Sequence, residues 1–334
     1  MQRLGSRIVQ FLIGLEVYEL ASLFMLGSLL VVFIVFPARI HRVIGIGNGP
    51  PLLANLDSLF LHNTTWLYIG LSICMSICVY ATRDKRHIYA KQLHRYARVV
   101  MTFIAVLVVF DTINFYITVF NPFDHDGLLR HLDTTLFGST PATWFDGMTC
   151  FPLTLIFCGA YASWFFMTYF SVFVFARHSE RAMKEYVTAA VLAFYVGYTT
   201  YFFVPAIGPV FTMSFHHTIG PLINLVDGMG PFLSRDCFPS LHTGLSVVMM
   251  IYAWRYRRRL LWFYVLDTTL IILSTMYLRV HYGIDLIAGA ALAVAVCQIA
   301  PAAVARWSQR EVSNPWDQRK PSTHAKQDEW SELA

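Results

Sequence analysis

The chain has 334 residues, of which 56% are hydrophobic and only 13% are charged, and its mean hydropathy is +0.53. Soluble domains usually carry about 25% charged residues, so this composition excludes an ordinary soluble protein and predicts a polytopic membrane protein. The formal net charge is +5. Its basic residues cluster in loops between apolar stretches, which is typical of membrane topology, and we expect no nucleic-acid partner.

Apolar stretches long enough to cross a bilayer recur along the chain. A helix needs ~20 apolar residues to span the ~30 Å hydrocarbon core. These stretches are continuously apolar, which favours helices over the alternating strands of a β-barrel. The first is too long for a cleavable signal peptide, and we interpret it as a signal-anchor helix. The sequence therefore predicts an all-α integral membrane protein with about eight transmembrane helices, at 16–36, 64–81, 98–120, 149–176, 187–205, 240–256, 260–279 and 282–305.

The chain divides into three expected parts. Residues 1–97 hold the first two helices and a basic cytoplasmic loop, and residues 98–305 hold the other six predicted helices. Residues 306–334 are polar, mix charges of both signs and contain two prolines, so they are expected to be a disordered cytoplasmic tail.

The distribution of arginine and lysine predicts the orientation in the membrane. Basic clusters fall at 83–98, 177–184 and 255–259, and the intervening loops hold far fewer basic residues. By the positive-inside rule, the clusters and both termini face the cytoplasm. Arg39 and Arg42 in the first loop run against this bias, but the later loops outweigh them.

Several polar residues inside or between the predicted helices have two interpretations. Asp111 and Asn114 share a helix face and form either a functional site or an interhelical hydrogen bond, which we favour. Asp267 follows the last arginine cluster and is expected to pair with it.

Among the six cysteines, Cys150 and Cys237 fall on the predicted outer face, where a disulfide is compatible with an oxidising compartment. No cysteine or histidine spacing resembles a zinc site, and we expect no metal or other cofactor.

Residues 121–146 form a long polar segment on the predicted outer face. Its leucines recur at helical spacing, which predicts a helix lying flat in the interface. Asp124, Asp126 and Asp133 give it a negative side, which either steers a substrate headgroup or is the solvated face of a lid; we favour the latter. Further on, Tyr201 precedes a proline-rich turn and is expected to shape a pocket wall.

Two stretches, CFPSLHTG (237–244) and STMYLRVHYGIDLIAG (274–289), each place a histidine where an apolar helix meets an outer loop. His242 lies 16 residues before Arg258, or about 24 Å of helix at 1.5 Å per residue. His281 opens the last helix, and the residues after it are enough to cross the bilayer. Both histidines are therefore expected at one depth, on the extracytoplasmic face.

These stretches carry a set of residues suited to phosphoryl chemistry. His281 and Asp285 are four apart, so the carboxylate can hold one ring nitrogen and leave the other nucleophilic. His242 suits a general acid that protonates a leaving alkoxide. Arg279 is a fixed cation for phosphoryl oxygens, and Ser240 is an N-cap or an additional phosphate donor. The amides at the starts of both helices are expected to point at the same anion.

FPSLHTG and STMYLRVHYGIDLIAG resemble the second and third signature motifs of the type 2 phosphatidic acid phosphatase (PAP2) superfamily. They are most similar to the branch of inositol phosphorylceramide synthase, the aureobasidin-resistance protein, and its bacterial relatives. The resemblance covers roughly residues 100–300. It implies a six-helix core and a metal-independent phosphohistidine mechanism, with His281 as nucleophile, Asp285 as its orienting partner and His242 as the acid.

The chain departs from the lipid-phosphatase pattern in three ways. Thr275 stands where those enzymes have an arginine, Leu241 stands where they have a glycine, and their first, basic motif is absent from the outer loops. The departures favour the synthase-like branch. They leave two candidates for holding the phosphate, Arg279 first and Arg235 second.

The expected function is that of a lipid phosphatase or phosphotransferase whose substrate is a lipid in the membrane, with its site on the periplasmic or lumenal face. Whether the acceptor is water or a lipid alcohol depends on how well the pocket excludes water, and both remain open. The alternative from another class is a non-enzymatic lipid-phosphate-binding protein or transporter on the same scaffold. A CDP-alcohol phosphotransferase is disfavoured because its aspartate-rich metal motif is missing.

Overall fold

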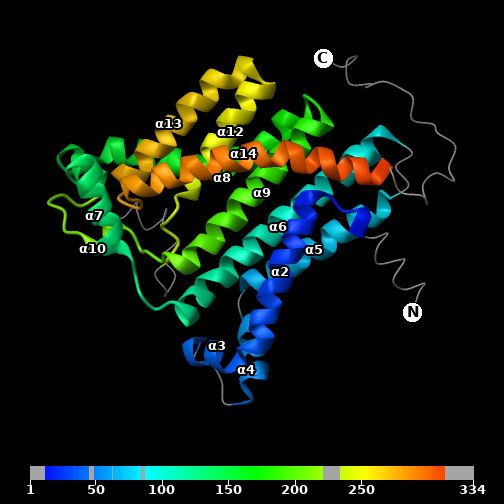
Figure 1. The fold of residues 1–334 in the computed structure, drawn as a ribbon, viewed down its shortest axis with the longest axis horizontal. Coiled ribbons are helices and arrows are strands. Elements are labelled where there is room, and N and C mark those ends of the chain that lie inside the picture. Colours follow the sequence, from blue (N-terminus) through cyan, green and yellow to red (C-terminus); the bar gives the residue numbers. More distant parts are fainter. Residues whose placement is uncertain (1–11, 45–48, 62, 84–86, 221–233, 313–334) are drawn as a thin grey trace.

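A computed structural model describes residues 12–44, 49–61, 63–83, 87–220 and 234–312, and every regular element in these ranges is a helix (Figure 1). The predicted all-α class is confirmed, and the chain is a multi-pass membrane protein. Seven of the described helices are long and apolar enough to cross a membrane. The remaining predicted stretch, 240–256, forms a shorter helix of 16 residues, α12 (Leu241–Tyr256). The seven long helices are α2 (Val17–Val35), α5 (Asn63–Ala81), α6 (Ile88–Phe120), α8 (Phe151–Ala176), α9 (Glu180–Phe203), α13 (Leu261–Tyr277) and α14 (Gly283–Val312).

Three helices extend well beyond their predicted bounds. α6 begins at Ile88 rather than at 98, α9 begins at Glu180 rather than at 187, and α14 continues to Val312 rather than ending at 305. The added residues are polar but include good helix formers such as arginine, lysine and glutamine, so nothing in them ends a helix. The first part of the predicted tail, 306–312, is therefore helical, and 313–334 lie outside the described residues.

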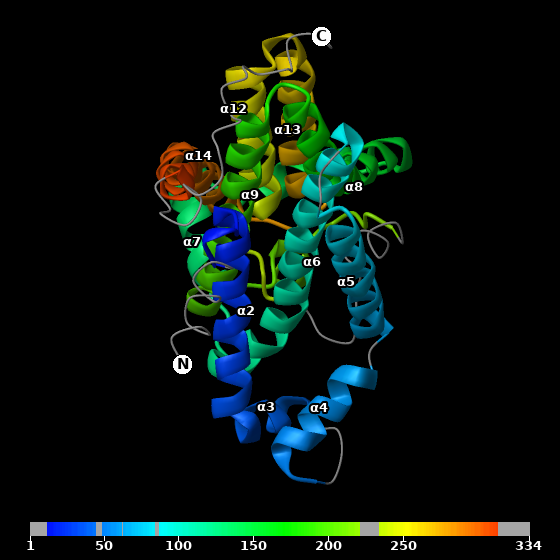
Figure 2. The same ribbon diagram turned by 90° about the vertical axis from the view of Figure 1, so that its right-hand side faces the viewer.

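The helix α9 forms the centre of the bundle. Of the most apolar 18-residue segment of α9, 67% of the residues are buried. The helix packs against α2, α6, α8, α12 and α14. Its buried small residues Ala182, Ala189, Ala190 and Ala193 allow these neighbours to approach closely. By contrast, no residue is buried in the corresponding 18-residue segment of α5. This helix packs at the edge of the bundle, mainly against α6 (Figure 2).

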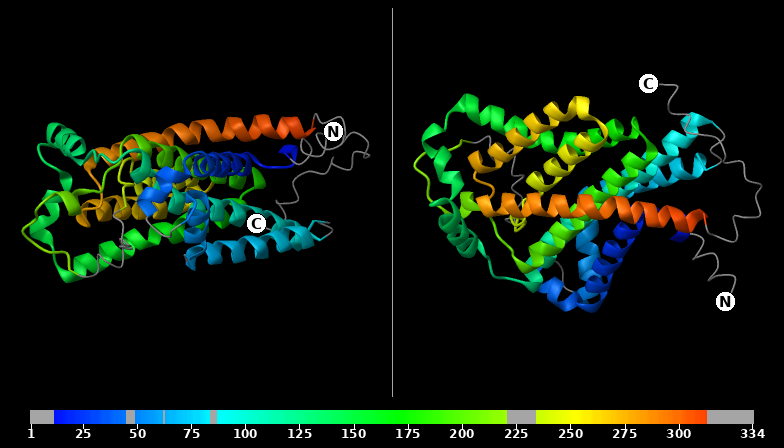
Figure 3. Two further views of the ribbon diagram at one scale, coloured as in Figure 1. Left: turned by 90° about the horizontal axis from the view of Figure 1, so that it is seen from below. Right: turned by 45° about the horizontal axis from the view of Figure 1, so that its top comes forward.

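The last helix lies across the others along the long axis of the molecule. Figure 1 shows α14 with α12 and α13 on one side and α9, α6 and α2 on the other. α2 and α14 also lie side by side when the molecule is seen from below (Figure 3), and Trp307 donates a hydrogen bond of 2.7 Å to the Leu15 carbonyl. Two short helices, α3 (Pro37–Ile44) and α4 (Pro51–Leu61), cover one end of the bundle (Figure 2).

Asp111 and Asp267, two carboxylates of the predicted membrane helices, each accept a hydrogen bond from a neighbouring helix. Asp111 accepts a hydrogen bond of 2.8 Å from the Tyr68 hydroxyl of α5, which confirms the interhelical interpretation with Tyr68 as the partner. The expected pairing of Asp267 with the arginine cluster is wrong, because the side chain faces α8 and accepts a hydrogen bond of 3.3 Å from Ser163. Both residues therefore join helices.

The start of α12 lies in direct backbone contact with the first turns of α14. A Cβ atom on Gly289 would lie 2.2 Å from the Ser240 carbonyl oxygen, and one on Gly244 would lie 3.2 Å from the Gly289 oxygen. Only glycine permits such an approach between backbones. This contact holds the two histidine-bearing stretches together.

Replacing Gly289 by alanine is expected to lower the thermal unfolding temperature of the detergent-solubilised protein, because the opposing oxygen belongs to the backbone and cannot swing away. Overpacking of this kind costs about 1–3 kcal/mol. Gly159 in α8 is a matched control, since nothing lies within 4 Å of its Cβ position. Gly159→Ala is expected to be neutral or slightly stabilising. Equal unfolding temperatures for both variants would contradict the proposed contact.

Candidate active site

The loop between α13 and α14 positions the residues of the third sequence motif. α13 ends at Tyr277 and α14 begins at Gly283. Arg279 in this loop has φ of +64°, and it is the only non-glycine residue among those described with a left-handed backbone. Its carbonyl accepts a hydrogen bond of 2.8 Å from the Val210 amide, which holds the turn against α10 (Pro209–Thr212). The turn brings both Arg279 and His281 into the buried end of the bundle.

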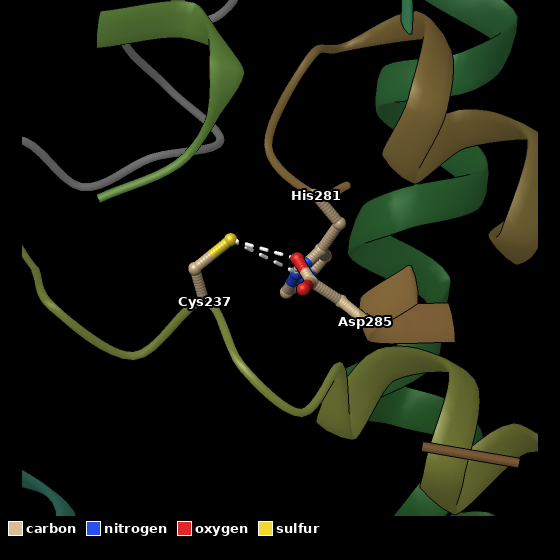
Figure 4. A group of neighbouring side chains, drawn as sticks. All are labelled: Cys237, His281 and Asp285. Carbon is tan, nitrogen blue, oxygen red and sulfur yellow. Dashed lines mark hydrogen bonds and ion pairs between the residues drawn. The ribbon is translucent and has the colours of Figure 1, made fainter. Parts of the chain in front are cut away.

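His281 and Asp285 form a buried pair at the start of α14. The Nδ1 atom of His281 lies 3.4 Å from Oδ2 of Asp285, and the exposed fractions of the two residues are 5% and 0%. The same Oδ2 accepts hydrogen bonds from the Tyr282 amide at 2.8 Å and from the Cys237 thiol at 2.9 Å (Figure 4). A carboxylate fixed in this way orients the imidazole, so that Nδ1 faces Asp285 and Nε2 is directed away from it.

His242 lies close to His281, although the two come from different helices. Their ring centroids are 5.7 Å apart. On its other sides the His242 ring stacks on Tyr161 at 4.2 Å and contacts Trp164 at 4.4 Å, both from α8. The aromatic rings fix the orientation of the imidazole. The sequence did not single out Tyr161 and Trp164, because nothing distinguishes them from the many other aromatic residues of the apolar stretches.

The Arg279 side chain is buried and paired. Its Nη2 atom lies 2.9 Å from Oδ1 of Asp146, and its guanidinium lies 3.9 Å from the centre of the Phe215 ring. Asp146 also accepts hydrogen bonds from the His216 and His217 amides at 2.8 and 3.1 Å. Burial raises the pKa of Asp146, but these donors and Arg279 outweigh it and hold the pKa below its usual value. Burial lowers the pKa of Arg279, and Asp146 partly offsets this effect.

The lowered pKa of Asp146 predicts a defined pH dependence. A carboxylate with a depressed folded-state pKa contributes stability above its unfolded value of about 3.9 and loses it as the pH falls further. Asp146→Asn is therefore expected to lower the unfolding temperature at pH 7, and the difference from wild type should shrink below about pH 4. Asp57→Asn, at an exposed position of α4, is the control and should show no such difference. A difference for Asp146→Asn that does not change with pH would contradict this role.

The three other predicted site residues have well-defined partners. The expected N-cap is confirmed, because the Ser240 hydroxyl accepts a hydrogen bond from the Thr243 amide at 3.3 Å. The Ser240 amide also donates to the Asp285 carbonyl at 3.1 Å, linking α12 to α14. Tyr201 is buried, and its hydroxyl lies 3.5 Å from the Pro239 carbonyl, beside the second motif. Arg235 donates to Asp124 and to the Asn121 carbonyl, both at 2.6 Å.

The outer segment forms the expected helix, α7 (Asp126–Phe137). Asp124 is exposed, but the interpretation of Asp126 and Asp133 as a solvated face is wrong. Asp133 is fully buried and accepts hydrogen bonds of 2.9 and 2.8 Å from the Gly283 and Ile284 amides. Asp126 is also buried and accepts from the Ile207 and Gly208 amides at 3.1 and 2.8 Å. Asp133 thus supplies acceptors for the first amides of α14, and Asp126 supplies them for buried amides of the loop before α10.

This arrangement also corrects the expectation that the first amides of α14 point at a substrate anion, because Asp133 already occupies the two amides of Gly283 and Ile284. Burial raises the pKa of Asp133, and these amide hydrogen bonds oppose the effect only in part. A phosphate at the site would therefore rely on side chains rather than on this helix terminus.

Cys150 and Cys237 are both free, so the disulfide that the sequence left open is not formed. Cys150 is exposed, whereas Cys237 is buried with its sulfur 3.6 Å from Nδ1 of His281. Within the described ranges, Cys237, His281 and Asp285 form a group whose ligand atoms all lie within 4.8 Å of one another (Figure 4). Sequence spacing missed this group because the cysteine is 44 positions away from the histidine.

Comparison with known families agrees with the position of this site. The family model of the PAP2 superfamily matches residues 128–299, slightly more than half of the chain, and this range includes all of the site residues predicted above. The chain belongs to the PAP2 superfamily. Members of the PAP2 superfamily are generally phosphatases or phosphotransferases, and the chain is a membrane enzyme of this broad class. No curated protein and no solved structure matches the chain.

Proposed function

We propose that this PAP2 superfamily member cleaves or transfers a phosphoryl-linked group on a membrane lipid through a phosphohistidine on His281. The observation that carries the proposal is the buried His281–Asp285 pair at 3.4 Å, with the His242 ring centroid 5.7 Å from that of His281. A nucleophile, its orienting carboxylate and a second imidazole are the groups that two-step phosphoryl transfer needs.

In the first step, the lone pair on Nε2 of His281 attacks phosphorus, and the bond from phosphorus to the leaving oxygen breaks. His242 gives its proton to that oxygen, so the alcohol leaves neutral. Asp285 accepts the Nδ1 hydrogen bond and stabilises the positive charge that develops on the ring. Arg279 supplies charge-assisted donors to the phosphoryl oxygens beside its bond to Asp146.

In the second step, neutral His242 takes a proton from the acceptor hydroxyl, whose oxygen attacks phosphorus while the bond to His281 breaks. Water as the acceptor gives a lipid phosphatase, and a lipid alcohol gives a phosphotransferase of the inositol phosphorylceramide synthase type. The similarity of the two motifs to that branch supports the phosphotransferase. We further propose that 98–305 form the catalytic part, that the site faces the periplasmic or lumenal side, and that both termini are cytoplasmic.

The test supplies purified protein in mixed micelles with phosphatidate, a sphingolipid phosphate or a polyprenyl phosphate. For each substrate, the release of inorganic phosphate is measured. A parallel assay follows transfer of the headgroup from phosphatidylinositol to ceramide. We expect turnover of at least one substrate by wild type and none by His281→Ala. Binding of lipid phosphates without turnover in every assay would instead identify the non-enzymatic alternative.

Addition of EDTA is expected not to lower the activity, because the proposed reaction neutralises charge with arginine and imidazole rather than with a bound cation. The measurement is the initial rate before and after exhaustive chelation. Restoration of a chelated, inactive enzyme by Mg²⁺ alone would contradict the proposed mechanism.

A further inference from the structure

The proposed reaction does not use the Cys237 thiol, although this thiol touches both members of the catalytic pair. Its sulfur lies 2.9 Å from Oδ2 of Asp285 and 3.6 Å from Nδ1 of His281. Cys237 is 4% exposed and lies on the loop that leads into α12 (Figure 4). Three different donor atoms, a sulfur, a nitrogen and an oxygen, therefore converge from two parts of the chain.

Two of the three sides of the triangle formed by these atoms match the spacing of ligands on tetrahedral zinc. With bond lengths of 2.0–2.3 Å and tetrahedral angles, zinc ligand atoms lie about 3.3–3.6 Å apart. The sulfur-to-nitrogen distance of 3.6 Å and the nitrogen-to-oxygen distance of 3.4 Å agree with this range. The sulfur-to-oxygen distance of 2.9 Å is that of a hydrogen bond. It would lengthen by roughly 0.6 Å when a metal replaces the thiol proton.

The surroundings of the group are also those of a metal site. Oδ1 of Asp285 is buried and has no hydrogen-bond partner among the described residues, so the carboxylate has an unused acceptor. The Val280 carbonyl oxygen lies 3.3 Å from the same sulfur. A thiolate and an imidazole select zinc or cadmium over magnesium or calcium, which prefer oxygen ligands.

We propose that Cys237, His281 and Asp285 bind Zn²⁺ or Cd²⁺ at an inhibitory site. This inference rests on the proposed function, in which His281 is the nucleophile. A neutral imidazole has one lone pair and one N–H. When the lone pair of Nδ1 binds the metal, the ring proton is held at Nε2, and Nε2 can no longer attack phosphorus. The Cys237 thiol releases its proton to solvent on binding, as thiolate ligands do.

The first experiment measures binding without reference to activity. Cd²⁺ is titrated into the purified protein, and the thiolate-to-metal charge-transfer absorbance is recorded for wild type and Cys237→Ala. Cys297→Ala is the matched control, since Cys297 is equally buried but lies farther along α14. We expect Cys237→Ala to lose a saturable component that Cys297→Ala retains. Identical titrations of all three proteins would overturn the site.

The second experiment measures inhibition by Zn²⁺, with each variant compared with its own metal-free rate. Removal of a direct ligand is expected to raise the inhibitory concentration at least about 10-fold in Cys237→Ala and not in Cys297→Ala. Cys237→Ser, which keeps the size of the side chain, serves if the alanine variant does not fold. Equal zinc sensitivity of the active variants would overturn the inference alone. A wild type that binds Cd²⁺ through Cys237 but turns over no lipid phosphate would overturn the proposed function and support the site.

Discussion

Replacing His281 by alanine is expected to lower kcat/KM by at least about 10⁴-fold, because the variant lacks the proposed nucleophile. The loss should appear in the chemical step, so the KM for the lipid should change little. The measurement is initial-rate kinetics on the substrate that wild type turns over fastest. A companion measurement traps the phosphoenzyme by rapid acid-free denaturation with a phosphorus-labelled lipid, and His281→Ala should show no label.

His216→Ala is the control for this experiment. His216 is exposed, and only its backbone amide bonds to Asp146, so the substitution leaves that bond in place. We expect activity close to that of wild type. Full activity in His281→Ala, or equal losses in both variants, would show that the nucleophile lies elsewhere.

Replacing Asp285 by asparagine is expected to lower kcat/KM by about 10²- to 10⁴-fold with little loss of phospholipid binding. The asparagine amide can donate to Nδ1 of His281, which then has to carry its proton on Nε2 and loses its nucleophilic lone pair. The shape of the buried side chain is preserved. The measurement is the rate of phosphoenzyme formation in a single turnover, because a wrong tautomer slows this step specifically.

Asp267→Asn is the matched control, since Asp267 is an intramembrane carboxylate with a serine partner and no contact with the histidines among the described residues. It should keep wild-type kinetics. A structural explanation would predict that Asp285→Asn lowers the unfolding temperature and the activity together. A folded Asp285→Asn protein with normal phosphoenzyme formation would exclude the orienting role.

The positions of the membrane helices could be predicted because apolar length alone sets them. Their ends could not, since the charged residues that begin α6 and end α14 favour a helix as much as an exposed loop. The ten-residue error at the start of α6 and the seven-residue error at the end of α14 both arise where apolar character stops and helix propensity continues.

The pairing of His281 with Asp285 could be predicted because a spacing of four residues is a local property of a helix. The partners of the site could not. Asp146 reaches Arg279 from 133 positions away, and Cys237 reaches His281 from 44 positions away. The burial of Asp126 and Asp133 could not be predicted for the same reason, because the backbone amides that donate to these carboxylates come from distant parts of the chain. Local sequence patterns indicate the histidine–aspartate pair, and tertiary contacts decide which residues surround it.

The pairing of each candidate arginine with an aspartate has a consequence for how an anion reaches this enzyme. Arg279 and Asp146, like Arg235 and Asp124, form a compact dipole rather than a lone positive charge. The field of a dipole decays faster with distance than that of a single ion, and dissolved salt weakens it further. These two arginines therefore attract free phosphate in the surrounding water only weakly. The proposed lipid substrate needs no such attraction, since its membrane anchor would deliver the headgroup by lateral diffusion.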